Sequence, residues 1–207
     1  MSKRFASVSA AALVLALSAC SQPDAPAGDA TSEALDPQAV HFATLTLDTH
    51  VDIGAGYGTP ALDPGEHTHA QVDLPKMVEG GLDAAFFIVY VRQGETTPEG
   101  YVAARAAAEE KYAGISRMLA NDPDRIALAT TSDEVEEIAA SGRLVALIGM
   151  ENAYPLGDSV ADVPMWAERG VRYMSITHFG NNQFGGSSNP NTAAGEPEED
   201  PGLSDLG

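Results

Sequence analysis

Apolar runs alternate with helical patterns along this chain of 207 residues, and that alternation constrains the fold more than any other feature. The runs lack the strict polar–apolar alternation of a half-exposed strand, which indicates strands covered on both faces, as in a parallel sheet. Strands that alternate with helices are typical of a parallel α/β fold. The expected strands cover residues 43–48, 82–91, 144–150 and 171–177, with 125–129 as a short addition, and the expected helices cover 99–122, 132–142 and 158–169.

Polar side chains follow these runs at their carboxyl ends. His50 and Asp52 end the first run, and they share one face because side chains at i and i+2 of a strand point the same way. Glu151 follows the third run, and His178 follows the fourth. The carboxyl ends of the strands in a parallel barrel converge on one mouth, so we expect these four residues to lie close together.

Histidine, aspartate and glutamate together form a ligand set for a divalent metal such as zinc. Carboxylates can also bridge two ions, and a metal pair activates water and polarises a carbonyl, as amide hydrolysis requires. Structural alternatives remain, since Glu151 can cap a loop and His178 can be a hydrogen-bonded core histidine. Tyr90 and Arg92 end the second run, where packing is the competing explanation, and Tyr90 is kept as a candidate for substrate contact.

The composition and the motifs exclude several classes of protein. Acidic residues outnumber basic ones by 30 to 11, and a net charge of −19 repels phosphate backbones, so we expect no nucleic-acid partner. No glycine-rich phosphate loop follows any expected strand. The sequence also lacks the Gly-x-Ser-x-Gly motif of serine hydrolases.

The first residues have the pattern of an export signal. Two basic residues precede an apolar run and then small residues, so we expect residues 1–19 to be a signal peptide. Leu17 to Cys20 resemble a bacterial lipobox, which predicts lipidation of Cys20 and attachment to a membrane on the periplasmic side of the cell envelope. Residues 20–40 are predicted to be a flexible tether, because they lack apolar periodicity over most of their length.

Five segments carry a resemblance to a known family: LDTHVDI, QVDLPKMVEGGLDAAFFIVYV, GRLVALIGMENAYPLGD, RGVRYMSITHFGNNQFGGSS and GLSDLG. Together they resemble the membrane dipeptidase family, also called renal dipeptidase-like, within the amidohydrolase superfamily. The resemblance implies a (β/α)8 TIM barrel and the hydrolysis of dipeptides by a metal-activated water.

The same resemblance implies roles for the polar residues. His50 and Asp52 bind one zinc ion, and Glu151 bridges it to a second. His178 is implied to be a catalytic residue that contacts the substrate and stabilises the tetrahedral intermediate, rather than a metal ligand. Asn152, directly after Glu151, belongs to a segment that departs mildly from many relatives.

The length of the chain sets a limit on this interpretation. A barrel of this kind needs about 250 residues, so residues 41–207 are expected to form the N-terminal half, about four βα units, and to be inactive alone. One alternative is a non-catalytic lipoprotein that binds a partner, such as a second copy in a homodimer, through unpaired sheet edges. Another is a metal-dependent amidohydrolase that acts on a cyclic amide or lactam.

Overall fold

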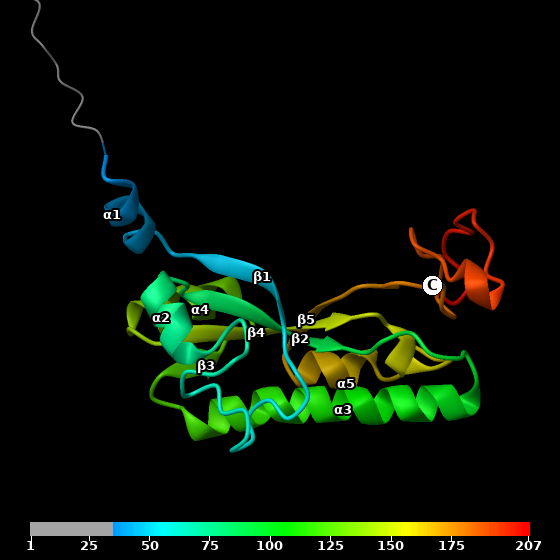
Figure 1. Cartoon of the computed structure of the whole chain (residues 1–207), viewed down its shortest axis with the longest axis horizontal. Coiled ribbons are helices and arrows are strands. Elements are labelled where there is room, and N and C mark those ends of the chain that lie inside the picture. Colours follow the sequence, from blue (N-terminus) through cyan, green and yellow to red (C-terminus); the bar gives the residue numbers. More distant parts are fainter. Residues whose placement is uncertain (1–34) are drawn as a thin grey trace, which may run out of the picture. The chain divides into compact units, whose positions relative to one another are not determined.

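The computed structural model describes residues 35–207, and these residues form a parallel sheet covered by helices (Figure 1). The predicted signal peptide, Cys20 and residues 20–34 of the predicted tether lie outside the described residues. All strand pairs are parallel, in the order β1-β2-β4-β3, with β5 also paired to β4. The strands are β1 (Leu47–Asp52), β2 (Ala84–Tyr90), β3 (Ile126–Leu128), β4 (Leu144–Glu151) and β5 (Val171–Met174).

Strand β4 is the centre of the sheet. It pairs along its whole length with β2, so that Tyr90 lies beside Glu151. On its other side, β3 pairs with the amino-terminal half of β4 and β5 with the carboxyl-terminal half. Figure 1 shows the carboxyl ends of β2, β4 and β5 pointing toward the region where the C-terminal segment lies.

The helices begin at residues whose side chains cap them. Thr97 accepts a hydrogen bond from the Gly100 amide at the start of the longest helix, and Thr131 with Glu134 forms a capping box at the start of α4. Every helix of the described part is too short or too polar to span a lipid bilayer. The α-helices are α1 (Pro37–Phe42), α2 (Leu74–Gly80), α3 (Pro98–Asn121), α4 (Ser132–Ala140) and α5 (Val163–Glu168), and the 3-10 helices are η1 (Tyr154–Leu156) and η2 (Thr192–Ala194).

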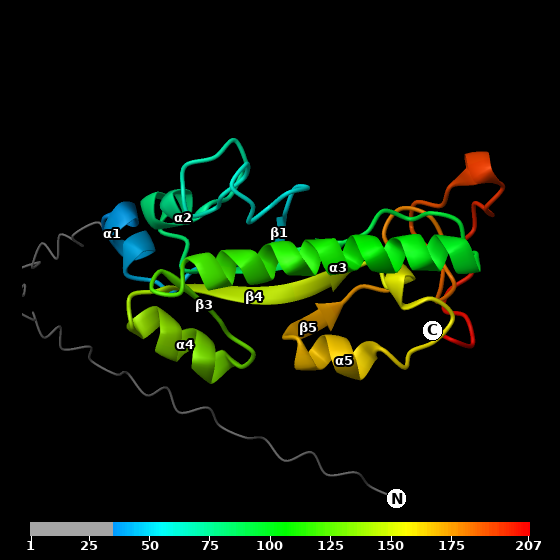
Figure 2. The same ribbon diagram turned by 90° about the horizontal axis from the view of Figure 1, so that it is seen from below.

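The two faces of the sheet carry separate apolar clusters. Helix α3 runs along one face, as Figure 2 shows, and buries a stripe of small and aliphatic residues there. Ile138 of α4 packs on the opposite face against Val145 and Leu147. Because side chains alternate along a strand, Glu151 lies on the same face of β4 as Val145 and Leu147, at the carboxyl end of the strand.

The structure corrects parts of the sequence prediction. Residues 37–40, predicted to belong to the tether, form the start of α1, because Asp36 caps the helix and Pro37 fits its first turn. The His41 Nε2 atom lies 2.7 Å from the Gly80 carbonyl oxygen and so connects α1 to the end of α2. The first strand begins at Leu47 rather than at residue 43, because Ala43 still caps α1. Helix α2 was not predicted.

Candidate metal centre

His50, Asp52 and Glu151 lie together at the carboxyl ends of β1 and β4. The His50 Nε2 atom is 3.7 Å from Asp52 Oδ1 and 3.4 Å from Glu151 Oε2. One ligand atom from each residue lies within 4.8 Å of the other two. Atoms about 2.1 Å from a tetrahedral zinc ion are roughly 3.4 Å apart, so the donor types and the two distances from His50 fit zinc.

A local irregularity in β1 directs two of these side chains. The pairing of β1 with β2 shifts between Asp48 and Val51, as at a β-bulge. The Asp48 carboxylate accepts a hydrogen bond of 2.9 Å from the His50 amide within this bulge. Val51 is buried in the core that faces α3, so its neighbours His50 and Asp52 project from the other face, toward Glu151.

Glu151 lies between two histidines and directs one oxygen to each. Its Oε1 atom is 3.5 Å from His178 Nε2, while Oε2 faces His50. The Tyr90 hydroxyl is 3.2 Å from the other ring nitrogen of His178, and the two rings meet edge to face. The structure therefore places all five site residues predicted within residues 35–207 in one connected group.

Tyr173 also belongs to the site, although no sequence motif pointed to it. Its hydroxyl donates a 3.0 Å hydrogen bond to the Thr49 carbonyl and lies 3.2 Å from His50 Nδ1. Burial, together with the negative charges of Glu151, Asp52 and Asp48, raises the pKa of Tyr173 to about 12. The side chain therefore remains a neutral phenol near pH 7.

Asn152 joins the loops that follow three strands. It is fully buried and adopts a left-handed conformation with φ of 72°. Its Nδ2 atom donates to the Val91 carbonyl at 3.0 Å and to Gln93 Oε1 at 3.2 Å, at the end of β2. Its Oδ1 atom accepts from Asn182 Nδ2 at 2.9 Å, in the segment after β5. The backbone next to Glu151 is thus fixed against the loops that carry Tyr90 and His178.

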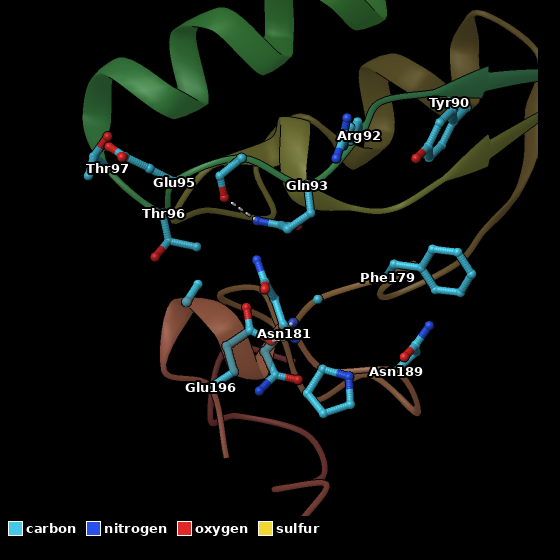
Figure 3. Close-up of a pocket in the computed structure, with 15 residues that line it drawn as sticks. Tyr90, Arg92, Gln93, Glu95, Thr96, Thr97, Phe179, Asn181, Asn189 and Glu196 are labelled. Atoms are coloured by element: carbon cyan, nitrogen blue, oxygen red, sulfur yellow. Dashed lines mark hydrogen bonds between the residues drawn. The ribbon is translucent and has the colours of Figure 1, made fainter. Parts of the chain in front are cut away.

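A cavity of about 830 Å³ opens beside Tyr90. Figure 3 shows the loop after β2 on one side of it and the segment after β5, with Phe179 and Asn181, on the other. Arg92 lines this cavity. Among the lysines and arginines of residues 35–207, it is the one whose side chain makes no hydrogen bond or ion pair.

A parallel α/β sheet with histidine and carboxylate side chains at the carboxyl ends of its strands is typical of metal-dependent hydrolases. The family model for membrane dipeptidase, peptidase family M19, matches residues 36–207, and the chain belongs to this family. The resemblance identified from the motifs is therefore confirmed.

Individual relatives agree with this assignment. Dipeptidase aclJ of Aspergillus oryzae is 30% identical over 129 residues, which are 60% of this chain and 31% of that protein. The crystal structure of the probable dipeptidase PvdM from Pseudomonas aeruginosa matches with a TM-score of 0.76 and 28% identity, over 82% of this chain and 44% of that one. The predicted parallel α/β fold of a barrel enzyme is confirmed for the described residues.

A more distant match shows the fold alone. It is a metallo peptidase from Rhodobacter sphaeroides, liganded with a phosphinate mimic of the dipeptide L-Ala-D-Ala, at 21% identity and a TM-score of 0.57. It covers 68% of this chain and 47% of that one. The chain thus spans about a third of the curated relative aclJ and under half of these solved structures.

Proposed function

We propose that this chain belongs to a zinc-dependent dipeptidase in which His50, Asp52 and Glu151 hold the metal. The observation that carries the proposal is the approach of three ligand atoms, from two strands that are not neighbours in the sheet, to within 4.8 Å of one another. Family membership supports the dipeptide as substrate. The family resemblance implies a second ion, and Glu151, which has one oxygen turned away from His50, would be the residue that helps to hold it.

Bound zinc supplies an activated water and polarises the peptide carbonyl. Side chains next to the metal ligands orient the substrate carbonyl. His178 faces the same carboxylate from the other side, where its ring can donate a hydrogen bond to a carbonyl oxygen that gains negative charge. Tyr90 holds the orientation of that ring through its hydroxyl. We therefore propose His178 for catalysis and substrate contact, and Tyr90, predicted as a substrate contact, for the orientation of His178 beside the substrate.

We also propose that the substrate extends from the metal into the cavity beside Tyr90. Arg92 is available there to bind a carboxylate of the dipeptide, since its side chain makes no ion pair with an acidic residue of the described part, although Glu95 and Glu196 also line the cavity. In a chain with a net charge of −19, an unpaired guanidinium at the site gives an anionic substrate group a local partner.

Metal analysis of the purified chain tests the proposal. We expect bound zinc in the wild type, and a loss of at least tenfold in zinc affinity for Asp52→Asn and for Glu151→Gln, since each change removes a charged ligand. The control is Glu79→Gln, because this exposed carboxylate also faces a histidine, His67, at 3.0 Å but lies outside the cluster. Zinc binding that survives both ligand changes, or that falls equally in the control, would contradict the assignment.

A dipeptidase assay is a separate measurement. The chain spans under half the length of the solved relatives that it matches, so the metal assignment does not require turnover by this chain alone. Zinc binding without turnover would therefore leave the metal assignment intact.

A further inference from the structure

Tyr173 reaches His50 by crossing the face of the sheet. It stands on β5 at the register position of Gly149 in β4, and a Cβ atom at Gly149 would clash with its ring. The ring then packs on Phe86 of β2, with the centroids 5.1 Å apart. Its hydroxyl ends at Thr49 and His50 of β1. The absence of a side chain at Gly149 therefore permits a contact between the fifth strand and the first.

The hydrogen bonds of this hydroxyl determine a proton position. A phenol has one proton to donate, and the Thr49 carbonyl oxygen can only accept. The hydroxyl therefore donates to Thr49, and its contact with His50 Nδ1 requires that the ring nitrogen be the donor. A neutral imidazole with its proton on Nδ1 has a lone pair on Nε2, the atom that faces Asp52 and Glu151.

We propose that Tyr173 is a positioning residue that fixes the Nδ1–H tautomer of His50 and so presents Nε2 to the metal. This inference rests on the proposed metal role of His50. The other tyrosine–histidine pair of the site differs, because the Tyr90 hydroxyl has His178 as its one hydrogen-bond partner among the described residues. The Tyr90 hydroxyl has no second acceptor of this kind, so its contact with His178 does not by itself determine a tautomer.

The tautomer can be measured without metal or activity. In a long-range ¹H–¹⁵N spectrum of the ¹⁵N-labelled chain, with the His50 signals assigned by their loss in His50→Gln, we expect a protonated Nδ1 in the metal-free and zinc-loaded forms. A His50 ring with an unprotonated Nδ1 in the wild type would overturn the inference. If the wild type binds no zinc, the proposed function fails, while the ring-nitrogen shifts still decide the role of Tyr173.

Substitution tests the consequence for metal binding. Tyr173→Phe should weaken zinc binding by about 10- to 100-fold, as changes of residues that orient metal ligands do, with the circular dichroism spectrum unchanged. Gly149→Ala should give a loss in the same direction, because the methyl group displaces the ring. The matched control is Tyr112→Phe, whose hydroxyl also donates to a backbone carbonyl, that of Arg169, and whose zinc affinity should stay within twofold. A Tyr173→Phe protein that binds zinc as the wild type does would overturn the inference.

Discussion

The role in carboxylate binding proposed for Arg92 would not require this residue to support the fold. Its side chain is exposed at the cavity and contacts no acidic group of the described residues, so its removal leaves no buried charge unpaired. Asn152 is the opposite case, because it is fully buried and its amide joins three loops. Changes at Asn152 would alter stability and the site together, whereas changes at Arg92 report on ligand binding alone.

Substitution of Arg92 therefore gives a direct test of carboxylate recognition. We expect Arg92→Gln to weaken the binding of a dipeptide with a free C-terminal carboxylate to the zinc-loaded chain by roughly fivefold, about 1 kcal/mol, since an exposed ion pair contributes little more. Isothermal titration calorimetry measures the difference. The control ligand is the same dipeptide with an amidated C-terminus, which should bind equally to both proteins. A wild-type chain that does not distinguish the two ligands would contradict the role of Arg92.

Helix α2 depends on one buried carboxylate at its start. Asp73 is fully buried and caps the helix by accepting from the Lys76 amide at 3.0 Å. Burial alone raises its pKa, but hydrogen bonds from the Lys76 ammonium and from Thr68 outweigh that effect and hold the pKa of Asp73 at about 2, below the ordinary 3.8. This carboxylate therefore favours the folded state only while it is ionised.

The pH dependence of stability follows with a definite sign. A carboxyl group whose pKa is lower in the folded state stabilises the fold at pH values above its unfolded-state pKa. This stabilisation is lost as the pH falls to the folded-state pKa, here between about pH 4 and about pH 2. We expect Asp73→Asn to destabilise the chain by about 2 kcal/mol at pH 7, and the difference from wild type to shrink across that window. Urea unfolding at a series of pH values measures it. A difference that stays constant down to pH 2 would exclude the ionic contribution.

The sequence predicted some elements of this fold better than others. The Asp73 cap, Pro75 and the closing glycines are ordinary helix signals, but α2 has only seven residues and two buried side chains, too few for a visible period. The ends of the strands were easier to predict, because a polar residue directly after an apolar run can be recognised in the local sequence, as at Glu151. The contact of Tyr173 with His50 depends on the register of β5 against β4 at Gly149 and on the position of Phe86 in β2. No local sequence pattern encodes these long-range alignments.

At the scale of the whole molecule, the candidate metal centre links parts of the chain that are distant in sequence. β1 and β4 do not pair with each other, and β2 lies between them. Electrostatic repulsion between Asp52 and Glu151 opposes the approach of the carboxyl ends of β1 and β4, and a bound divalent cation would remove this repulsion. An ion held by Asp52 and Glu151 therefore acts as a cross-link in the folded state that the unfolded chain lacks.

Zinc should for this reason stabilise the chain measurably. At a free concentration about one hundred times its Kd, a ligand that binds only the folded state adds about 2.7 kcal/mol. For a chain of this size each kcal/mol raises Tm by about 2–4 °C, so we expect a rise of roughly 5–10 °C in a thermal melt.

EDTA should reverse this rise in Tm, and Glu151→Gln should lose most of it, because the link between β1 and β4 is broken. Mg²⁺ should have a smaller effect, since it prefers oxygen ligands and the cluster includes an imidazole. An equal rise in Glu151→Gln would place the stabilising ion elsewhere, because a cross-link between these strands cannot form without this carboxylate.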